Sequence, residues 1–181
     1  MNWTIDSAHS EINFSARHMM IATVRGRFEK FSGDVDFNEN DPTQSRVEIK
    51  IDASSINTRE PQRDGHLMSP DFLDVEVYPF ITFKSKRIDV KDEGHALITG
   101  DLTIRDITRE IVLDVQFAGL AKSPYGTTNA GFGASTRINR KDWGLTWNVA
   151  LETGGVLVSE EIKIDIELEI VKQAEGELVA A

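Results

Sequence analysis

The chain has 181 residues, a formal net charge of −10 and no cysteine. Its hydrophobic content of 40% is enough for one substantial core, and single β-barrels commonly reach this length, so we expect one domain. The negative charge disfavours binding to nucleic acid and to anionic membrane surfaces, and the lack of cysteine excludes disulfides, thiol nucleophiles and thiolate metal ligands.

Residues 1–10, "MNWTIDSAHS", contain neither the basic region nor the apolar region of a secretory signal. No apolar run in the sequence is long enough to span a membrane, so we expect no integral membrane segment. The sequence as written therefore predicts a cytoplasmic protein. A periplasmic location is the alternative if the natural protein carries a signal that this sequence lacks.

Alternation of apolar and polar residues with period two predicts β-strands along most of the chain. In residues 11–18, for example, Ile12, Phe14 and Ala16 share one face and polar residues occupy the other. A strand with one apolar face is half-buried, so these segments should enclose a common core. Eight strands are predicted, at residues 11–18, 26–37, 46–52, 80–90, 96–106, 109–117, 128–138 and 161–171.

The connections between most of these strands are short and polar, which favours sequential antiparallel pairing. Eight strands of this kind can close into an up-and-down barrel. Less regular alternation predicts bulges near Glu29 and in the glycine-rich residues 128–138. We therefore expect an all-β fold, an extended eight-stranded antiparallel barrel, in a single domain over residues 1–172. Residues 173–181 are predicted to be a solvated C-terminal tail.

Residues 58–76 interrupt the strand pattern and predict a short helical insertion. Thr58 is a candidate N-cap for a helix that tolerates Pro61 in its first turn, and Ser69-Pro70-Asp71 is a second helix-start signal. An insertion with apolar residues between two barrel strands is expected to pack against the barrel, and its open end is the surface available for this. We expect these residues to form a lid.

Small eight-stranded barrels either fill their interior with side chains or leave one ligand cavity. The inward-phase residues here are mostly of medium size and are interrupted by Gly100, Gly131, Gly133 and Ala134, which favours a cavity. A barrel packed solid is the alternative.

Five segments of the chain resemble, in order and spacing, the YceI-like family of bacterial polyisoprenoid-binding proteins. The resemblance covers residues 3–171 and implies a lipocalin-like barrel that holds an isoprenoid chain, of polyprenyl phosphate or quinone type, as a non-enzymatic carrier or reservoir. Arg105-Asp106 departs from the His-Gly pair that is more common in the family, so no role of that pair is transferred here. The segments are "WTIDSAHSEINFSARHM", "VRGRFEKFSGDVDF", "RDGHLMSPDFLDVEVYPFITFKS", "ITGDLTIRDITREI" and "INRKDWGLTW".

A hydrophobic small molecule, an isoprenoid lipid, is thus the expected partner, with no cofactor required and a homodimer as a plausible assembly. Residues with inward strand phase are expected to line the pore: Phe14, Ile49, Ile98, Leu102, Leu113, Val115, Ile164 and Ile166. Residues of the lid and the barrel rim are expected to lie near the ligand as well: His18, Asp64, His66, Leu67, Phe72 and Trp143.

Three interpretations of His9, His18, Asp64 and His66 remain open. They could form a hydrogen-bonded network that fixes the lid, because buried polar groups need partners. They could contact a polar headgroup, since imidazole donates to phosphate or to a quinone carbonyl. They could instead serve a metal-dependent or hydrolytic enzyme, although their spacing fits no established metal motif. We expect the first, with no catalytic residues and no metal.

Overall fold

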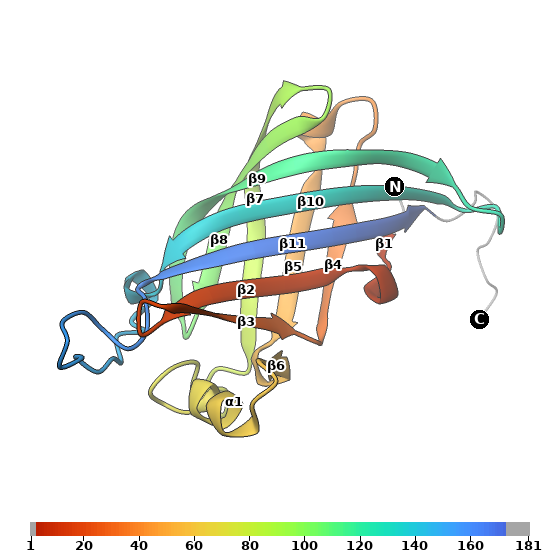
Figure 1. Cartoon of the computed structure of the whole chain (residues 1–181). Coiled ribbons are helices and arrows are strands. Elements are labelled where there is room, and N and C mark those ends of the chain that lie inside the picture. Colours follow the sequence, from red (N-terminus) through yellow and green to blue (C-terminus); the bar gives the residue numbers. More distant parts are fainter. Residues whose placement is uncertain (1–2, 173–181) are drawn as a thin grey trace.

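The structure is a computed structural model that describes residues 3–172. Its centre is a closed ring of eight antiparallel strands (Figure 1). The predicted all-β, eight-stranded antiparallel barrel is therefore confirmed, whereas the predicted tail at 173–181 lies outside the described residues. The ring strands, in spatial order, are β1 (Trp3–Ile5), β4 (Phe31–Asp36), β5 (Arg46–Asp52), β7 (Phe80–Asp92), β8 (His95–Ile104), β9 (Ile107–Lys122), β10 (Thr128–Asn139) and β11 (Glu161–Lys172).

Strand β11 closes the ring by pairing with β1, and it also pairs with a second set of strands outside the ring. Its end at 170–172 pairs with β1, and its residues 163–167 pair along the same edge with β2 (Glu11–His18). Strand β2 then pairs with β3 (Ala22–Phe28), and β3 pairs with the short β6 (Ile56–Asn57). The chain bends between β1 and β2 through a 3-10 turn, η1 (Ser7–His9).

The alternation in β11 explains how it forms part of the barrel wall. Ile162, Ile164 and Ile166 are half-buried on the inner face, while Lys163 and Asp165 between them are exposed. Because side chains of a strand alternate between its two faces, this spacing buries one apolar row and leaves charges in water. Strand β10 pairs with β11 over twelve consecutive residues, from 128 to 139.

The predicted strand at residues 26–37 is wrong, because the chain forms two strands, β3 and β4, with a break at Glu29 and Lys30. The backbone N–H of Glu29 donates to Ser55 outside the sheet. Phe28 and Phe31 both line the barrel interior. Residues three apart point to opposite faces of a continuous strand, so the break is what brings both rings inside. Strands β1 and β6 were not predicted.

A bulge lies against the glycine-rich strand β10, but its extra residue is Ala118 of β9 and not, as predicted, a residue of 128–138. The pairing of β9 with β10 shifts register between Gly131 and Phe132. Across the shift, Gly131 pairs with Gly119, whose φ of 119° is a conformation that glycine adopts readily. The bulge thus bends two long strands at a point where neither has a side chain to clash.

The predicted lid contains one helix, α1 (Pro61–Met68), followed by turns. Its N-cap is Glu60 and not Thr58, since the Glu60 carboxylate accepts from the backbone N–H groups of Gln62 and Arg63. The second predicted helix start is also wrong: Ser69 ends α1 as its C-cap, and residues 70–77 form turns. Within residues 3–172, no helix has the length and hydropathy needed to cross a membrane.

Gly100 in β8 lets β7 approach closely, and replacing it with alanine should lower the free energy of unfolding by about 2 kcal/mol. A Cβ atom there would lie 2.6 Å from the Lys84 carbonyl oxygen and 2.5 Å from the Phe83 ring. Gly133→Ala is the matched control, because nothing lies within 4 Å of a Cβ at that position. Urea unfolding should separate the two variants, and equal stabilities would contradict the close-approach argument.

Candidate functional site

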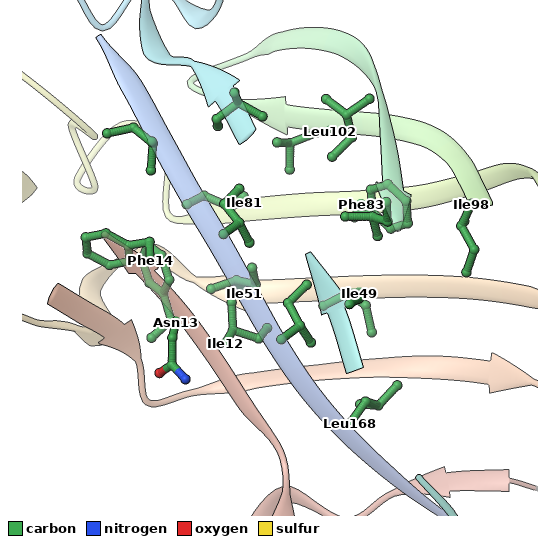
Figure 2. A pocket seen from close by; sticks show the side chains of 18 of the residues that line it. Ile12, Asn13, Phe14, Ile49, Ile51, Ile81, Phe83, Ile98, Leu102 and Leu168 are labelled. Atoms are coloured by element: carbon green, nitrogen blue, oxygen red, sulfur yellow. The ribbon is translucent and has the colours of Figure 1, made fainter. Parts of the chain in front are cut away.

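The barrel encloses an apolar cavity of about 800 Å³. Inward-facing side chains of the ring strands and of β2 surround it, and Figure 2 shows such residues from β2, β5, β7 and β8 around the open space. The structure places all of the sequence-predicted pore residues on its wall: Phe14, Ile49, Ile98, Leu102, Leu113, Val115, Ile164 and Ile166. That these residues contact a ligand remains a prediction.

Several phenylalanines also line the cavity, and we did not predict them. Phe28 stacks near Phe14 with ring centroids 5.5 Å apart, and Phe83 lies on β7. Phe37, Phe117 and Phe132 form a cluster of rings at centroid distances of 5.2–6.0 Å. Strand phase alone could have placed Phe83 and Phe117. The same holds for Phe37, which shares the phase of Val35 in the predicted strand at 26–37, although β4 itself ends at Asp36.

An aromatic cluster lies where the lid meets the cavity. The His66 ring on α1 is edge-to-face with Trp147 at 4.6 Å and with Phe72 at 5.1 Å. These three residues line the cavity, as do the predicted rim residues His18 and Leu67. Trp147 was not predicted, because nothing in the sequence of its irregular loop indicates which face it presents.

Two predicted rim residues do not line the cavity. Trp143 is buried, and its indole N–H donates to the Leu102 carbonyl at 2.9 Å, so it packs behind the barrel wall. The Asp64 carboxylate accepts from the backbone N–H and the hydroxyl of Thr58 at 2.9 and 2.5 Å. Asp64 therefore fixes the start of the lid and does not face the ligand space.

Arg140 is a cavity residue that sequence analysis did not select. Its guanidinium is only 3% exposed and donates to the carbonyls of Leu145, Trp147, Ser159 and Val158 at 2.6–3.3 Å. Burial lowers the pKa of Arg140 below its ordinary value. These bonds tie the irregular segment that follows η4 (Arg140–Trp143) to the barrel.

The structure does not assemble His9, His18, Asp64 and His66 into one site. His66 pairs with Asp71 at 2.8 Å, and Asp64 binds Thr58. Among residues 3–172, no three of those four side chains place their nitrogen or oxygen atoms within 4.8 Å of one another. The four side chains therefore do not form one compact cluster of ligand atoms, although Asp64 bonds a backbone N–H group of the lid, as the network interpretation expected.

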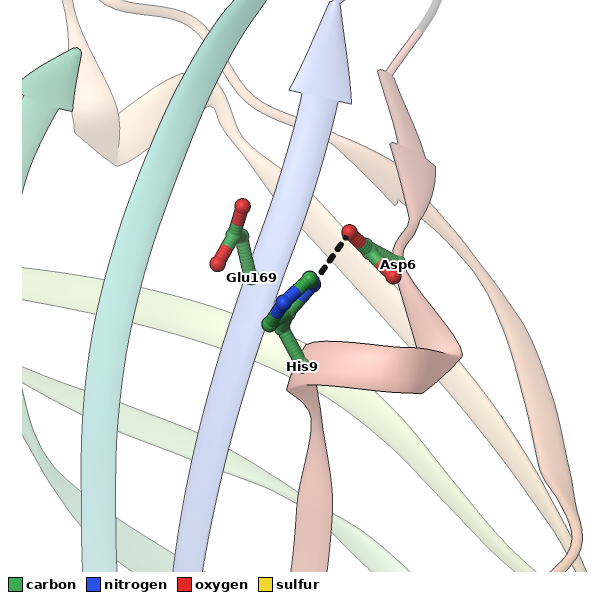
Figure 3. A group of neighbouring side chains, drawn as sticks. All are labelled: Asp6, His9 and Glu169. Carbon is green, nitrogen blue, oxygen red and sulfur yellow. Dashed lines mark hydrogen bonds and ion pairs between the residues drawn. The ribbon is translucent and has the colours of Figure 1, made fainter. Parts of the chain in front are cut away.

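His9 belongs to a different group, with Asp6 and Glu169. Their ligand-type atoms lie within 4.8 Å of one another, and Figure 3 shows His9 joined to Asp6 with Glu169 beside them on β11. His9 Nδ1 and the Asp6 carboxylate are 2.8 Å apart, while the Asp6 carboxylate also accepts from Ala8. Because Asp6 is the N-cap of η1, this pair holds the bend between β1 and β2.

The hydrogen bond to Asp6 raises the pKa of His9 above its ordinary value, and the same bond lowers the pKa of Asp6. The stabilisation from charged His9 is therefore complete below pH of about 6.5 and is lost as pH rises through the raised pKa. We expect an NMR titration of His9 to show this raised pKa and Asp6→Asn to lower it. Asp89→Asn, which removes a distant carboxylate, should leave it unchanged; an unchanged His9 pKa in Asp6→Asn would contradict the pairing.

A model of the YceI-like domain matches residues 3–170, almost the whole of the described barrel. The chain belongs to the YceI-like family. The UPF0312 protein SAS2572 of Staphylococcus aureus is a relative with 37% identity over 169 residues, which cover 93% of this chain and 96% of that protein.

Solved YceI-like structures share the fold. The Campylobacter jejuni YCEI protein is 30% identical, with a TM-score of 0.77 over 96% of this chain and 99% of its own. A polyisoprenoid binding domain from Saccharophagus degradans, implicated in plant cell wall breakdown, has a TM-score of 0.66 at 16% identity, over 94% of this chain and 98% of its own. At that identity the likeness concerns the fold.

Proposed function

We propose that this YceI-like protein binds a long-chain isoprenoid lipid, of polyprenyl phosphate or quinone type, inside the barrel and acts as a non-enzymatic carrier or reservoir. The observation that carries the proposal is the apolar cavity of about 800 Å³, lined by side chains from most of the ring strands. The Saccharophagus degradans domain of the same fold is described as polyisoprenoid binding, which supports the choice of lipid.

The energetics of the cavity favour a long chain. One five-carbon isoprene unit contributes on the order of 3 kcal/mol when it leaves water, whereas association costs roughly 4 to 15 kcal/mol. Several units must therefore be enclosed for useful affinity. A cavity of about 800 Å³ is near the upper end of the range of roughly 300 to 1,000 Å³ found for ligand pockets.

The absence of a catalytic role is part of the proposal. The residues that an enzyme of the predicted kind would need do not share partners: His9 pairs with Asp6, Asp64 with Thr58 and His66 with Asp71, and of the four only His18 and His66 line the cavity. Binding by apolar surface needs no cofactor and no directional chemistry.

Native mass spectrometry of the gently purified protein tests the proposal, since it detects bound lipid and bound metal together. We expect a lipid adduct that an organic extract identifies as an isoprenoid. If the protein is isolated empty, added isoprenoid should bind to it with one-to-one stoichiometry. Failure to bind any isoprenoid, or stoichiometric metal with turnover of a substrate, would reject the carrier function.

A further inference from the structure

The two ends of the cavity carry opposite charge. The acidic side chains on its wall come from the loop after β4 and from the β7–β8 turn: Glu39, Asp92 and Glu93. Most basic side chains on the wall come from the region of α1 and η4, and we call them the basic end: His18, Arg63, His66 and Arg140, with the exposed Arg17 beside His18. His95 is the exception, since it lies at the β7–β8 turn, where it pairs with Asp114. Figure 1 shows α1 at the bottom of the view and the β7–β8 turn at the top, on opposite sides of the molecule.

The basic end is one connected surface. The His66 ring packs edge-to-face against Trp147, and the backbone carbonyl of Trp147 accepts from Arg140 at 2.9 Å. The backbones of His18 and Val158 form an isolated β-bridge, and the carbonyl of Val158 also accepts from Arg140. Arg63 precedes His66 by three residues on α1, so the two side chains are on the same side of the helix. Elements far apart in the sequence thus place basic side chains around one end of the cavity.

The arginines of the basic end lack a carboxylate partner. Within the part of the chain that the structure describes, neither Arg63 nor Arg140 forms an ion pair; Arg63 donates from Nε and Nη2 to the hydroxyl and carbonyl of Thr58. Of the neighbouring acids, Asp64 accepts from the Thr58 hydroxyl that Arg63 also contacts, Asp71 pairs with His66 and Glu160 pairs with Lys141. None of the three acids lines the cavity. Arg140 is buried and Arg63 is half-buried, and charges shielded from water are normally paired, so this arrangement indicates a place for an anion.

We propose that the basic end binds the anionic group of a ligand whose apolar chain fills the barrel, and that this group is a phosphate. The inference rests on the proposed function and adds the class and the orientation of the ligand. Guanidinium groups bind phosphate oxygens with charge-assisted hydrogen bonds. The apolar middle of the cavity disfavours any charge, and the acidic end repels an anion, so only one orientation is favourable.

Binding of geranylgeranyl phosphate and geranylgeraniol to the wild-type protein tests the inference, because the two probes share one hydrocarbon chain. We expect the phosphate to bind at least about tenfold more tightly, as one or two charge-assisted hydrogen bonds would give. Inorganic phosphate alone should not compete at millimolar concentration, since it lacks the chain. Equal affinities, or tighter binding of the alcohol, would overturn the headgroup site and leave the carrier function standing. Binding of neither probe would reject both.

The variant Arg63→Gln tests whether the tighter binding of geranylgeranyl phosphate depends on the basic end. We expect it to weaken geranylgeranyl phosphate binding about tenfold and to change geranylgeraniol binding less than about twofold. Arg87→Gln is the matched control, because Arg87 pairs with Asp89 on β7 and does not line the cavity. A parallel loss of affinity for both probes in Arg63→Gln would show that the residue acts only through its bonds to Thr58, and would overturn its role in headgroup binding.

Discussion

Replacing Val115 with tryptophan should reduce isoprenoid affinity about a hundredfold, because the indole would occupy the space of roughly one isoprene unit, worth on the order of 3 kcal/mol. Val115 faces the cavity between Ala96 on β8 and Ala134 on β10, its partners in the neighbouring strands. These small neighbours give the ring room to lie along the barrel wall inside the cavity. The barrel should therefore stay folded, with an overpacking cost of about 1 to 3 kcal/mol.

Val112→Trp is the matched control for this experiment. Val112 lies on the same strand, β9, but its side chain is 46% exposed and it does not line the cavity. Isothermal titration with a defined isoprenoid should show normal affinity for this variant. Equal affinities for the two variants, each shown to be folded by circular dichroism, would exclude binding in the barrel interior.

Arg140→Met should lower the free energy of unfolding by about 3 to 5 kcal/mol, since each buried acceptor left without a donor costs about 1 to 3 kcal/mol. Methionine keeps much of the apolar stem but leaves the carbonyls of Leu145, Trp147, Val158 and Ser159 without the guanidinium. Urea unfolding measures the change.

Arg137→Met provides the comparison, three residues before Arg140 on the adjoining strand β10. Arg137 is exposed and pairs with Glu161 at 2.6 Å, a contact worth at most about 1 kcal/mol. A loss below that level in Arg140→Met would show that water replaces the guanidinium, and it would remove Arg140 as the residue that anchors the segment after η4.

The sequence predicted the regular parts of the barrel because period two is a local signal. Residues 161–170 alternate without exception, and the apolar row from Ile162 to Leu168 faces the cavity. The break at Glu29 could not be read in the same way, because it depends on where Ser55 lies, which is a long-range contact. Strand β1 was missed because its three residues, Trp3–Ile5, are too few to show a period.

In the candidate site too, local patterns were predicted and long-range contacts were not. Strand phase placed the pore residues on the cavity wall, whereas the lid residues depended on contacts between distant segments. Asp64 accepts a hydrogen bond from Thr58 and does not line the cavity. His66 packs against Trp147, which belongs to an irregular loop. The contacts of Arg140 could not be predicted, because its partners are backbone carbonyls, which every residue possesses.

The position of β1 has a consequence for how the protein folds. Ile5 pairs with Ile170, and Trp3 pairs with both Lys172 and Val35, so the ring closes only when the two extremes of the described chain meet. Loop-closure entropy makes such a distant contact slow to form, and it comes after the sequential hairpins from β7 to β11. During synthesis on a ribosome, the strands made before β11 can therefore form only an open sheet with an exposed apolar face. This sheet cannot close until β11 has emerged. Closure is a late event that depends on nearly the whole sequence.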